Sequence, residues 1–272
     1  MKSIGDLYNS LHGYHHKVSK NGGEVAYPIH KRFNDLSISE TSEFQDINDW
    51  LLNYIDFTKV ASLLDAGCGV GATSMAIAKQ ENCQVVGITL SEQELETANS
   101  FASKLNLSNC KFALQNMTAA SKEKYDVIIA VESVKHVHDL KNTIHNLVDS
   151  LNEGGEIIIV EDFLSSEVAK LSYADKFKKY WMVKQIYSVA DFEQEFNLKG
   201  LHKKEVIDFT DRVRKPSSMF LKLKFHVMNT LDYLLPIERV RSVLSIFLGG
   251  FILDYYYAKG QMKYKAIVYS KG

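Results

Sequence analysis

Short apolar runs alternate with helix-spaced apolar residues through the middle of the chain. Five runs are apolar almost throughout, which predicts strands buried on both faces: 60–66, 83–90, 111–115, 125–131 and 155–161. Helical spacing follows from about Ala72, from Ser91 to about Leu105, and between Leu140 and Leu151. This alternation predicts a doubly wound α/β domain, in which helices cover both faces of a parallel sheet.

The chain after residue 163 has a different pattern. Residues 164–200 and 217–258 are mostly helical in spacing, with an aromatic cluster in "FKKYWMVKQIY", whereas 202–210 and 263–270 have the pattern of strands. We expect these two strands to complete a Rossmann-like, mostly parallel sheet of seven strands. The helices between them are expected to cover a site at the carboxyl ends of the inner strands.

These patterns predict a single domain over residues 1–272. Its expected parts are an N-terminal cap (1–58), a cofactor-binding core (59–163), a helical lid and substrate region (164–200 and 217–258), and final strands (201–216 and 259–272).

Composition narrows the classes of partner. Lysine and arginine number 32 against 33 aspartates and glutamates, so no basic excess favours nucleic acid. The three cysteines form no CxxC pair, which fits a reducing, cytoplasmic location. The start of the sequence lacks a signal-peptide core, and the most apolar stretch, 243–253, is about half of the ~20 residues that span a bilayer. We expect that stretch to be a buried helix, with membrane-surface contact as the alternative, in a monomer or homodimer.

The turn "LLDAGCGVGA" (63–72) holds three glycines in five positions after the first predicted strand. Glycine permits positive φ and close approach of a ligand to the backbone, so the turn predicts a nucleotide or nucleoside site. The sequence "GCGVGA" also satisfies the dinucleotide pattern, and an NAD-dependent oxidoreductase is the rival interpretation. Three observations favour a nucleoside instead. Asp65 is an acid where a strand before a dinucleotide turn is normally apolar, Thr89 stands where that pattern has an acid, and sixty residues precede the turn.

Four segments stand in the order and spacing of one known family: "LLDAGCGVGATS", "VVGITLSEQELETA", "YDVIIAVESVKHVHD" and "LNEGGEIIIVEDF". On the strength of these segments, residues 60–163 resemble the class I S-adenosylmethionine-dependent methyltransferases. "GITLS" and "ESxxH" are similar to a small-molecule branch that includes tocopherol, sterol and natural-product methyltransferases and cyclopropane fatty-acid synthases. The resemblance implies S-adenosylmethionine as cofactor and methyl transfer to oxygen, nitrogen or carbon of a small, largely apolar metabolite.

The resemblance also implies roles for single residues. Asp65 would support the glycine loop or the cofactor's amino group, and Glu94 would reach the ribose, although Ser91 and Glu94 also have the spacing of a capping box. Asn116 would face the adenine amino group, with Met117 along the purine or in the core. The full set expected at the cofactor is Asp65, Gly67, Cys68, Gly69, Gly71, Thr89, Leu90, Glu94, Asn116, Met117, Ala130 and Val131.

Three polar residues follow the fourth and fifth predicted strands, where the acceptor would lie. His136 and Asp162 predict a general-base pair, and activity that rises through a pKa near 6–7. Glu132 is the third candidate, either catalytic or orienting the loop through backbone amides. A capping or core role is the alternative for His136.

The remaining motifs bear on metals and on the substrate. "HVHD" and "HGYHH" lack a third ligand at metal spacing, so no metal is expected, and Asp139 is predicted to cap a helix. Tyr14, with Tyr8 and Tyr27, is expected either to fold over the cofactor or to lie in an exposed polar arm. Tyr180 and Trp181 are expected to line an apolar pocket, with a place in a helix core as the alternative.

Two further interpretations stay open. The cationic residues in 211–226 would permit a lipid or prenyl amphiphile as substrate, which the protein would methylate or cyclopropanate. Cyclopropanation is the weaker of the two, because Lys135 stands where cyclopropane synthases place a glutamate. A cofactor-binding module without catalysis is the other.

Overall fold

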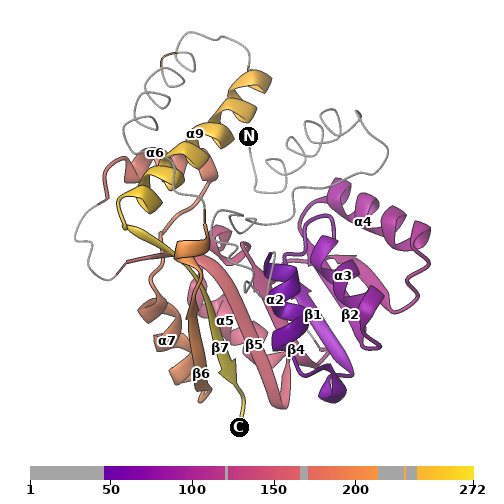
Figure 1. Ribbon diagram of the computed structural model, residues 1–272. Coiled ribbons are helices and arrows are strands. Elements are labelled where there is room, and N and C mark those ends of the chain that lie inside the picture. Colours follow the sequence, from indigo (N-terminus) through magenta and orange to yellow (C-terminus); the bar gives the residue numbers. More distant parts are fainter. Residues whose placement is uncertain (1–45, 120–121, 166–170, 214–229, 231–237) are drawn as a thin grey trace, which may run out of the picture.

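The computed structural model describes residues 46–119, 122–165, 171–213, 230 and 238–272, and its centre is a seven-stranded open sheet (Figure 1). The strand order is β3-β2-β1-β4-β5-β7-β6. β7 is antiparallel to both β5 and β6, and the other neighbouring strands pair in parallel. The strands are β1 Ser62–Ala66, β2 Gln84–Thr89, β3 Cys110–Leu114, β4 Tyr125–Val131, β5 Leu151–Leu164, β6 His202–Asp208 and β7 Met262–Ser270. The predicted Rossmann-like fold is confirmed.

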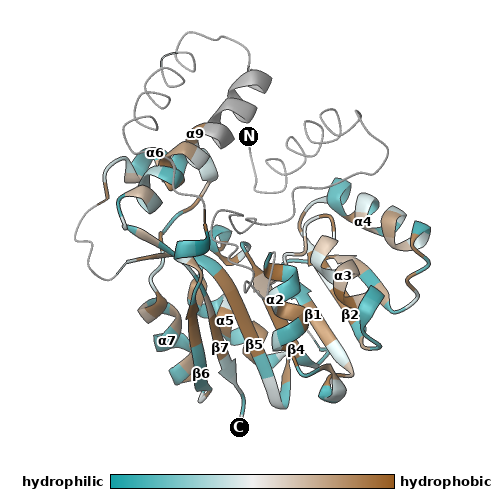
Figure 2. Cartoon of the chain, viewed as in Figure 1, coloured by the Kyte–Doolittle hydropathy of each residue, from teal (hydrophilic) through white to brown (hydrophobic). Residues whose placement is uncertain are grey.

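Helices cover both faces of this sheet, as the all-apolar strands require. The described helices are α2 Ile47–Tyr54, α3 Ala72–Gln80, α4 Glu92–Lys104, α5 Leu140–Asp149, α6 Ala174–Trp181, α7 Val189–Leu198 and α9 Glu238–Ala258. Short 3-10 turns are η3 Phe57–Lys59, η4 Val134–His136 and η5 Thr210–Arg212. One hydrophobic core joins the sheet to α2, α3, α6 and α9, and a second core joins it to α5 and α7. Hydrophobic residues accordingly concentrate on the central strands (Figure 2).

Local capping explains where two of the helices begin. Ser91 accepts a hydrogen bond from the Glu94 amide, and Asp139 accepts one from the Asn142 amide, each three residues into its helix. Both N-caps were predicted from the sequence and are confirmed.

The largest differences from prediction lie at β5 and at the lid. β5 extends to Leu164 because β7 pairs with it as far as Met262, whereas the apolar run alone ended at 161. The helical stretch predicted over 164–200 is two helices, α6 and α7, while part of 217–258 lies outside the described residues. No helix in the described part of the chain is long and apolar enough to cross a membrane.

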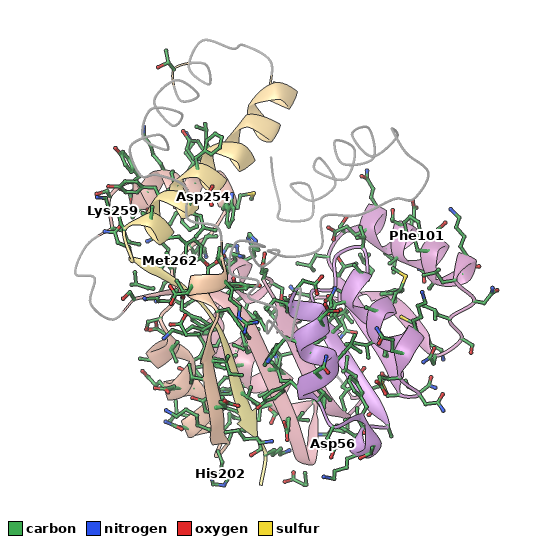
Figure 3. All side chains as sticks on the ribbon, viewed as in Figure 1. Asp56, Phe101, His202, Asp254, Lys259 and Met262 are labelled. Atoms are coloured by element: carbon green, nitrogen blue, oxygen red, sulfur yellow. The ribbon has the colours of Figure 1, made fainter. Side chains whose placement is uncertain are left out.

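α6 and α9 pack together beyond the carboxyl ends of the parallel strands (Figure 1). The Phe177 and Tyr256 rings meet edge to face at 5.6 Å, and the Tyr256 hydroxyl donates to the Ser172 carbonyl at 2.7 Å. Met262 begins β7 directly below these helices (Figure 3). The α6–α9 pair, called the lid below, therefore covers the edge of the sheet where ligands of such folds bind.

Candidate functional site

One glycine of the loop between β1 and α3 has open space where a side chain would lie. Gly67, Gly69 and Gly71 have φ values of +86°, +55° and +81°, a region that favours glycine. A Cβ on Gly67 or Gly71 would lie 2.5 Å from Ser133 Cβ or 2.4 Å from Phe112 Cζ, so these two glycines permit close packing. A Cβ on Gly69 would have Glu94 Oε1, 3.9 Å away, as its nearest described neighbour. The loop thus presents Gly69 to the space beside a carboxylate.

Two buried carboxylates flank this loop. Asp65 is 2% exposed and accepts from the Ser74 hydroxyl at 2.6 Å, and burial raises the pKa of Asp65 to about 6. Glu94 accepts from the Thr89 hydroxyl at 2.7 Å, and burial raises its pKa against the opposing effect of that hydrogen bond. Thr89, which replaces the acid of the dinucleotide pattern, therefore orients Glu94 toward the loop. One carboxylate oxygen of Glu94 is held by Thr89 while the other faces Gly69.

The other residues expected at the cofactor gather around the same strand ends. Met117 Cε lies 2.9 Å from the position of a Cβ on Gly67, so this side chain rests against the glycine loop. The Asn116 side-chain carbonyl accepts from the Thr118 amide at 2.9 Å, and Leu90 is 44% exposed after β2. Ala130 and Val131 are buried at the end of β4. Cys68 lies in the glycine loop, and burial raises the pKa of its thiol well above the ordinary value. Their individual contacts with a cofactor remain predictions.

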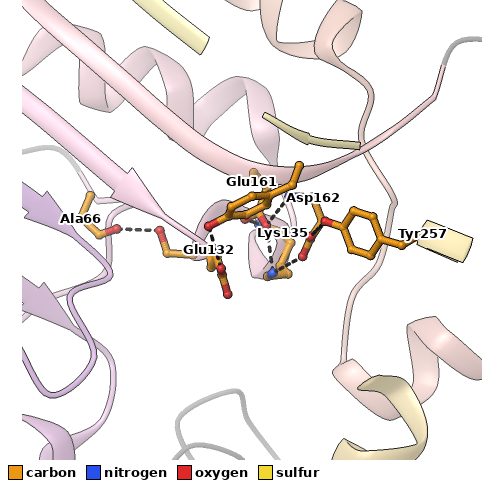
Figure 4. Close-up of polar contacts among 8 residues, drawn as sticks. Ala66, Glu132, Lys135, Glu161, Asp162 and Tyr257 are labelled. Atoms are coloured by element: carbon orange, nitrogen blue, oxygen red, sulfur yellow. Dashed lines mark hydrogen bonds and ion pairs between the residues drawn. The ribbon is translucent and has the colours of Figure 1, made fainter. Parts of the chain in front are cut away.

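An ionised cluster lies where the acceptor was expected, between the ends of β4 and β5 (Figure 4). Lys135 Nζ contacts Glu161 Oε1 at 2.9 Å and Asp162 Oδ2 at 2.8 Å. Burial opposes its charge, but Asp162, Glu161 and Glu132 together raise the pKa of Lys135 well above its ordinary value. Glu161 also accepts from the Lys135 amide at 3.1 Å, and burial raises the pKa of this carboxyl. The cluster therefore keeps a protonated lysine among three acidic side chains.

Two tyrosines complete this cluster. The Tyr257 hydroxyl donates to Asp162 Oδ1, and the Tyr264 hydroxyl donates to Glu132 Oε1 at 2.8 Å. Burial and the neighbouring carboxylates raise both tyrosine pKa values well above 10, so both stay protonated as hydrogen-bond donors. Glu132 itself adopts φ +52°, an uncommon conformation for a residue other than glycine. Sequence reasoning identified Glu132 and Asp162 but neither tyrosine.

The predicted titration of His136 is wrong. Burial first, and the Lys135 charge second, lower its pKa to about 3, against a hydrogen bond with the Trp181 backbone that raises it. His136 is therefore neutral near pH 7 and does not titrate near 6–7. The Asp162 carboxylate is held by Lys135 and Tyr257, and its expected pairing with His136 stays a prediction.

The residues expected at the substrate separate into three groups. Trp181 lies at the cluster, with its ring 5.2 Å from Lys135 Nζ. Tyr180 is 6% exposed and belongs to the hydrophobic core beneath the lid. Tyr14, together with Tyr8 and Tyr27, lies outside the described residues. No group of three or more potential metal ligands occurs in the parts of the chain that the structure describes.

A small pocket lies beside the cluster, with a cavity volume of about 10 Å³, which is room for about one water molecule. Its polar walls include Lys135, Glu161 and Asp162, and its apolar walls come from α6, the following loop and the start of β7: Phe177, Val183, Ile186, Tyr187 and Met262. A carboxylate thus faces an otherwise mostly apolar space.

Residues 58–229, more than half of the chain, match the family model described as "Methyltransferase domain". The chain belongs to this methyltransferase family. Among curated relatives, O-methyltransferase resE of Aspergillus sclerotiorum is 25% identical over 60% of this chain and 62% of its own length. The chloroplastic tocopherol O-methyltransferase of Arabidopsis thaliana is 30% identical over 48% of this chain and 37% of its own. The chain therefore covers less than two thirds of the length of these two relatives.

Solved structures agree on the fold. A geranyl diphosphate methyltransferase in complex with SAM has a TM-score of 0.63 at 20% identity, over 83% of this chain and 84% of its own. The [4+2]-cyclase SpnF has a TM-score of 0.70 at 17% identity, over 98% of this chain and 95% of its own. At such identities the likeness establishes a shared fold.

Proposed function

We propose that this chain transfers the methyl group of S-adenosylmethionine to a hydroxyl of a small, largely apolar molecule. The observation that carries the proposal is the open backbone of Gly69 in a methyltransferase-family core, where Glu94 Oε1 is 3.9 Å from the place that a Cβ would take. A carboxylate can accept from both hydroxyls of a ribose, whereas a pyrophosphate placed there would meet a negative charge.

The cofactor supplies an activated methyl group, so the main task of the protein is to position the acceptor and exclude water. Asp65, Gly69 and Glu94 hold the nucleoside and amino-acid parts at the ends of β1 and β2. The pocket beside β4 and β5 holds the acceptor, and the lid covers it. The relatives named O-methyltransferases and the structural neighbour in complex with SAM support the choice of reaction and cofactor.

Asp162 is the group that we assign to the acceptor's proton. It lines the pocket, and its two oxygens are fixed by Lys135 and Tyr257. A carboxylate has about four acceptor positions, so it can take a further hydrogen bond beside these two contacts. A hydroxyl that donates to Asp162 loses its proton to the carboxylate as the new O–CH3 bond forms and the S–CH3 bond breaks, which would leave S-adenosylhomocysteine. His136, neutral and attached to the Trp181 backbone, supports the lid residue rather than the proton transfer.

Charge argues for a neutral acceptor. The cluster has three acidic side chains, Glu132, Glu161 and Asp162, and one lysine, Lys135. Lys135 already forms ion pairs with two of these carboxylates. An anionic group such as a diphosphate at this point would be repelled in a medium of low dielectric constant. This disfavours an amphiphile whose anionic head enters the pocket, but leaves prenyl or aromatic alcohols as acceptors.

The test is transfer of labelled methyl from S-adenosylmethionine to a panel of phenols, prenyl alcohols, amines and diphosphates. Label on hydroxylated acceptors, lost in Asp162→Asn, is the expected result. Label only on amines or diphosphates would refute the hydroxyl assignment, and no label on any member would refute methyl transfer.

A second candidate comes from the likeness to SpnF, which is a [4+2]-cyclase. One fold hosts different reactions, so a cyclase of this fold is a specific competitor. Product masses separate the two, because methyl transfer adds the mass of one CH2 group to the acceptor and cyclisation leaves its mass unchanged. Location in the cytoplasm and the monomeric or dimeric state remain predictions.

A further inference from the structure

Lys135 has three neighbours that match the three N–H bonds of an ammonium. Its Nζ lies 2.9 Å from Glu161, 2.8 Å from Asp162 and 5.2 Å from the centre of the Trp181 ring. The side chain is 11% exposed, so these contacts are formed largely away from water. An ammonium over an indole face is a favourable cation–π arrangement, and more so when it is desolvated.

Trp181 is held by more than this one contact. The His136 ring hydrogen bonds with its backbone, and its indole packs directly on α9 at Gly249, where a Cβ would lie 2.1 Å from Cδ1. α9 also sends Tyr257 to Asp162. The lid therefore contacts the cluster at two points: Trp181 at Lys135, and Tyr257 at Asp162.

We propose that Lys135 is a positioning residue that holds the Asp162 carboxylate and the Trp181 indole in register at the acceptor pocket. The proposal rests on the proposed methyl transfer and adds a residue to it. Lys135 itself stays protonated, since the surrounding carboxylates raise its pKa well above its ordinary value, so it neither accepts nor releases the substrate proton. Its effect on the reaction passes through Asp162 and Trp181.

A purely structural ion pair is the competing explanation. Buried ion pairs contribute little net stability, although removal of one partner is strongly destabilising because the other is left uncompensated. A structural lysine would change the melting temperature and leave the turnover of the folded fraction unchanged. A positioning lysine changes kcat and the pH profile of protein that is still folded.

The variants are Lys135→Met, Lys135→Arg and, as control, Lys203→Met, which removes a 52%-exposed lysine paired with Glu193 at 2.8 Å. Measurements are kcat, KM and the pH profile with a hydroxylated acceptor, together with calorimetry of S-adenosylhomocysteine binding. We expect Lys135→Met to bind S-adenosylhomocysteine as the wild type does, and to lose about 100-fold in kcat, the loss typical of a misplaced reacting group.

The pH profile and the arginine variant sharpen this test. Removal of the neighbouring cation makes Asp162 easier to protonate, so the acid limb of the Lys135→Met profile moves to higher pH. Lys135→Arg keeps the charge and restores part of kcat, and Lys203→Met matches the wild type.

A folded Lys135→Met with wild-type kcat and an unchanged profile would overturn the proposal. If Lys135→Met does not fold, Gly249→Ala decides, because it displaces Trp181 without removing a charge: lowered kcat with intact S-adenosylhomocysteine binding supports the proposal, and wild-type kcat overturns it. Failure of the proposed function is distinguishable, since the wild type itself would then transfer no label to a hydroxylated acceptor.

Discussion

Two adjacent glycines in α9 predict opposite effects of the same substitution. A Cβ on Gly249 would lie 2.1 Å from Trp181 Cδ1 and 2.3 Å from Nε1, whereas no described atom lies within 4 Å of a Cβ on Gly250. Both residues are inside the same helix, so both alanine variants receive the same benefit in helix propensity. The difference between them isolates the contact of Gly249 with the indole.

The magnitude follows from these distances. Carbon atoms in contact are about 3.5 Å apart, so the indole must move by at least about 1.4 Å in Gly249→Ala. Overpacking of this kind costs about 1–3 kcal/mol, while alanine in place of glycine in a helix gains about 1 kcal/mol. Gly250→Ala is therefore expected to raise the free energy of unfolding by up to about 1 kcal/mol. Gly249→Ala is expected to be about 1–3 kcal/mol less stable than Gly250→Ala.

Thermal unfolding of the two variants side by side measures this difference. For a domain of this size, 1 kcal/mol shifts Tm by about 2–4 °C, so Gly249→Ala should melt several degrees below Gly250→Ala. Tryptophan fluorescence should change in Gly249→Ala alone, because only that variant displaces Trp181. Equal Tm values and unchanged fluorescence in both variants would refute the packing of Trp181 on α9.

Four further predictions concern the cofactor loop and the titrating groups. Gly69→Val should abolish S-adenosylhomocysteine binding while the protein still folds, and a folded variant that binds normally would contradict the placement of the ligand. Glu94→Gln should weaken binding by about 10- to 100-fold, the worth of a charged hydrogen bond, with the exposed Glu92→Gln of the same helical turn as a control that binds normally. Because the pKa of His136 is lowered to about 3, His136→Asn should leave the shape of the pH–rate profile between about pH 5.5 and 8 unchanged; loss of a limb there would show that His136 titrates in that range. Burial raises the pKa of Asp65 to about 6 from 3.8, so the folded apoprotein favours the protonated form of this carboxyl. The part of the free energy of unfolding that Asp65 supplies is therefore largest below about pH 4 and is lost as pH rises through 6. Urea unfolding should then show Asp65→Asn gaining about 2–3 kcal/mol relative to the wild type from about pH 4 to 7, and a constant difference would argue against that pKa.

Local signals in the sequence predicted the fold and the place of the glycine loop within it. Apolar runs predicted five of the seven strands, and the strand patterns at 202–210 and 263–270 predicted the other two. Side-chain caps at Ser91 and Asp139 predicted where two helices begin. The glycine turn and Glu94 lie within about thirty residues of each other, so their proximity follows from one β-α-β unit.

The acceptor site was less predictable because its partners come from distant segments. Tyr257 is 95 residues from Asp162, and Tyr264 is 132 residues from Glu132. The antiparallel β7, which brings Tyr264 beside the cluster, carries no motif that marks it as functional. Lys135 was visible in the sequence, but a lysine between strand end and helix is usually solvent-exposed.

The error at His136 has the same origin. A histidine after the fourth strand, with an aspartate after the fifth, is a reasonable base pair from sequence order alone. Its actual pKa depends on enclosure by the lid and on the fixed charge of Lys135, and both are properties of the assembled structure.

Calorimetric titration of the purified chain with S-adenosylhomocysteine, and separately with NAD, tests the central claim most directly. A saturable heat with S-adenosylhomocysteine that is lost in Gly69→Val, and no heat with NAD, is the predicted result. Saturable binding of NAD with none of S-adenosylhomocysteine would contradict the claim that the loop at Gly69 seats an adenosyl sulfonium.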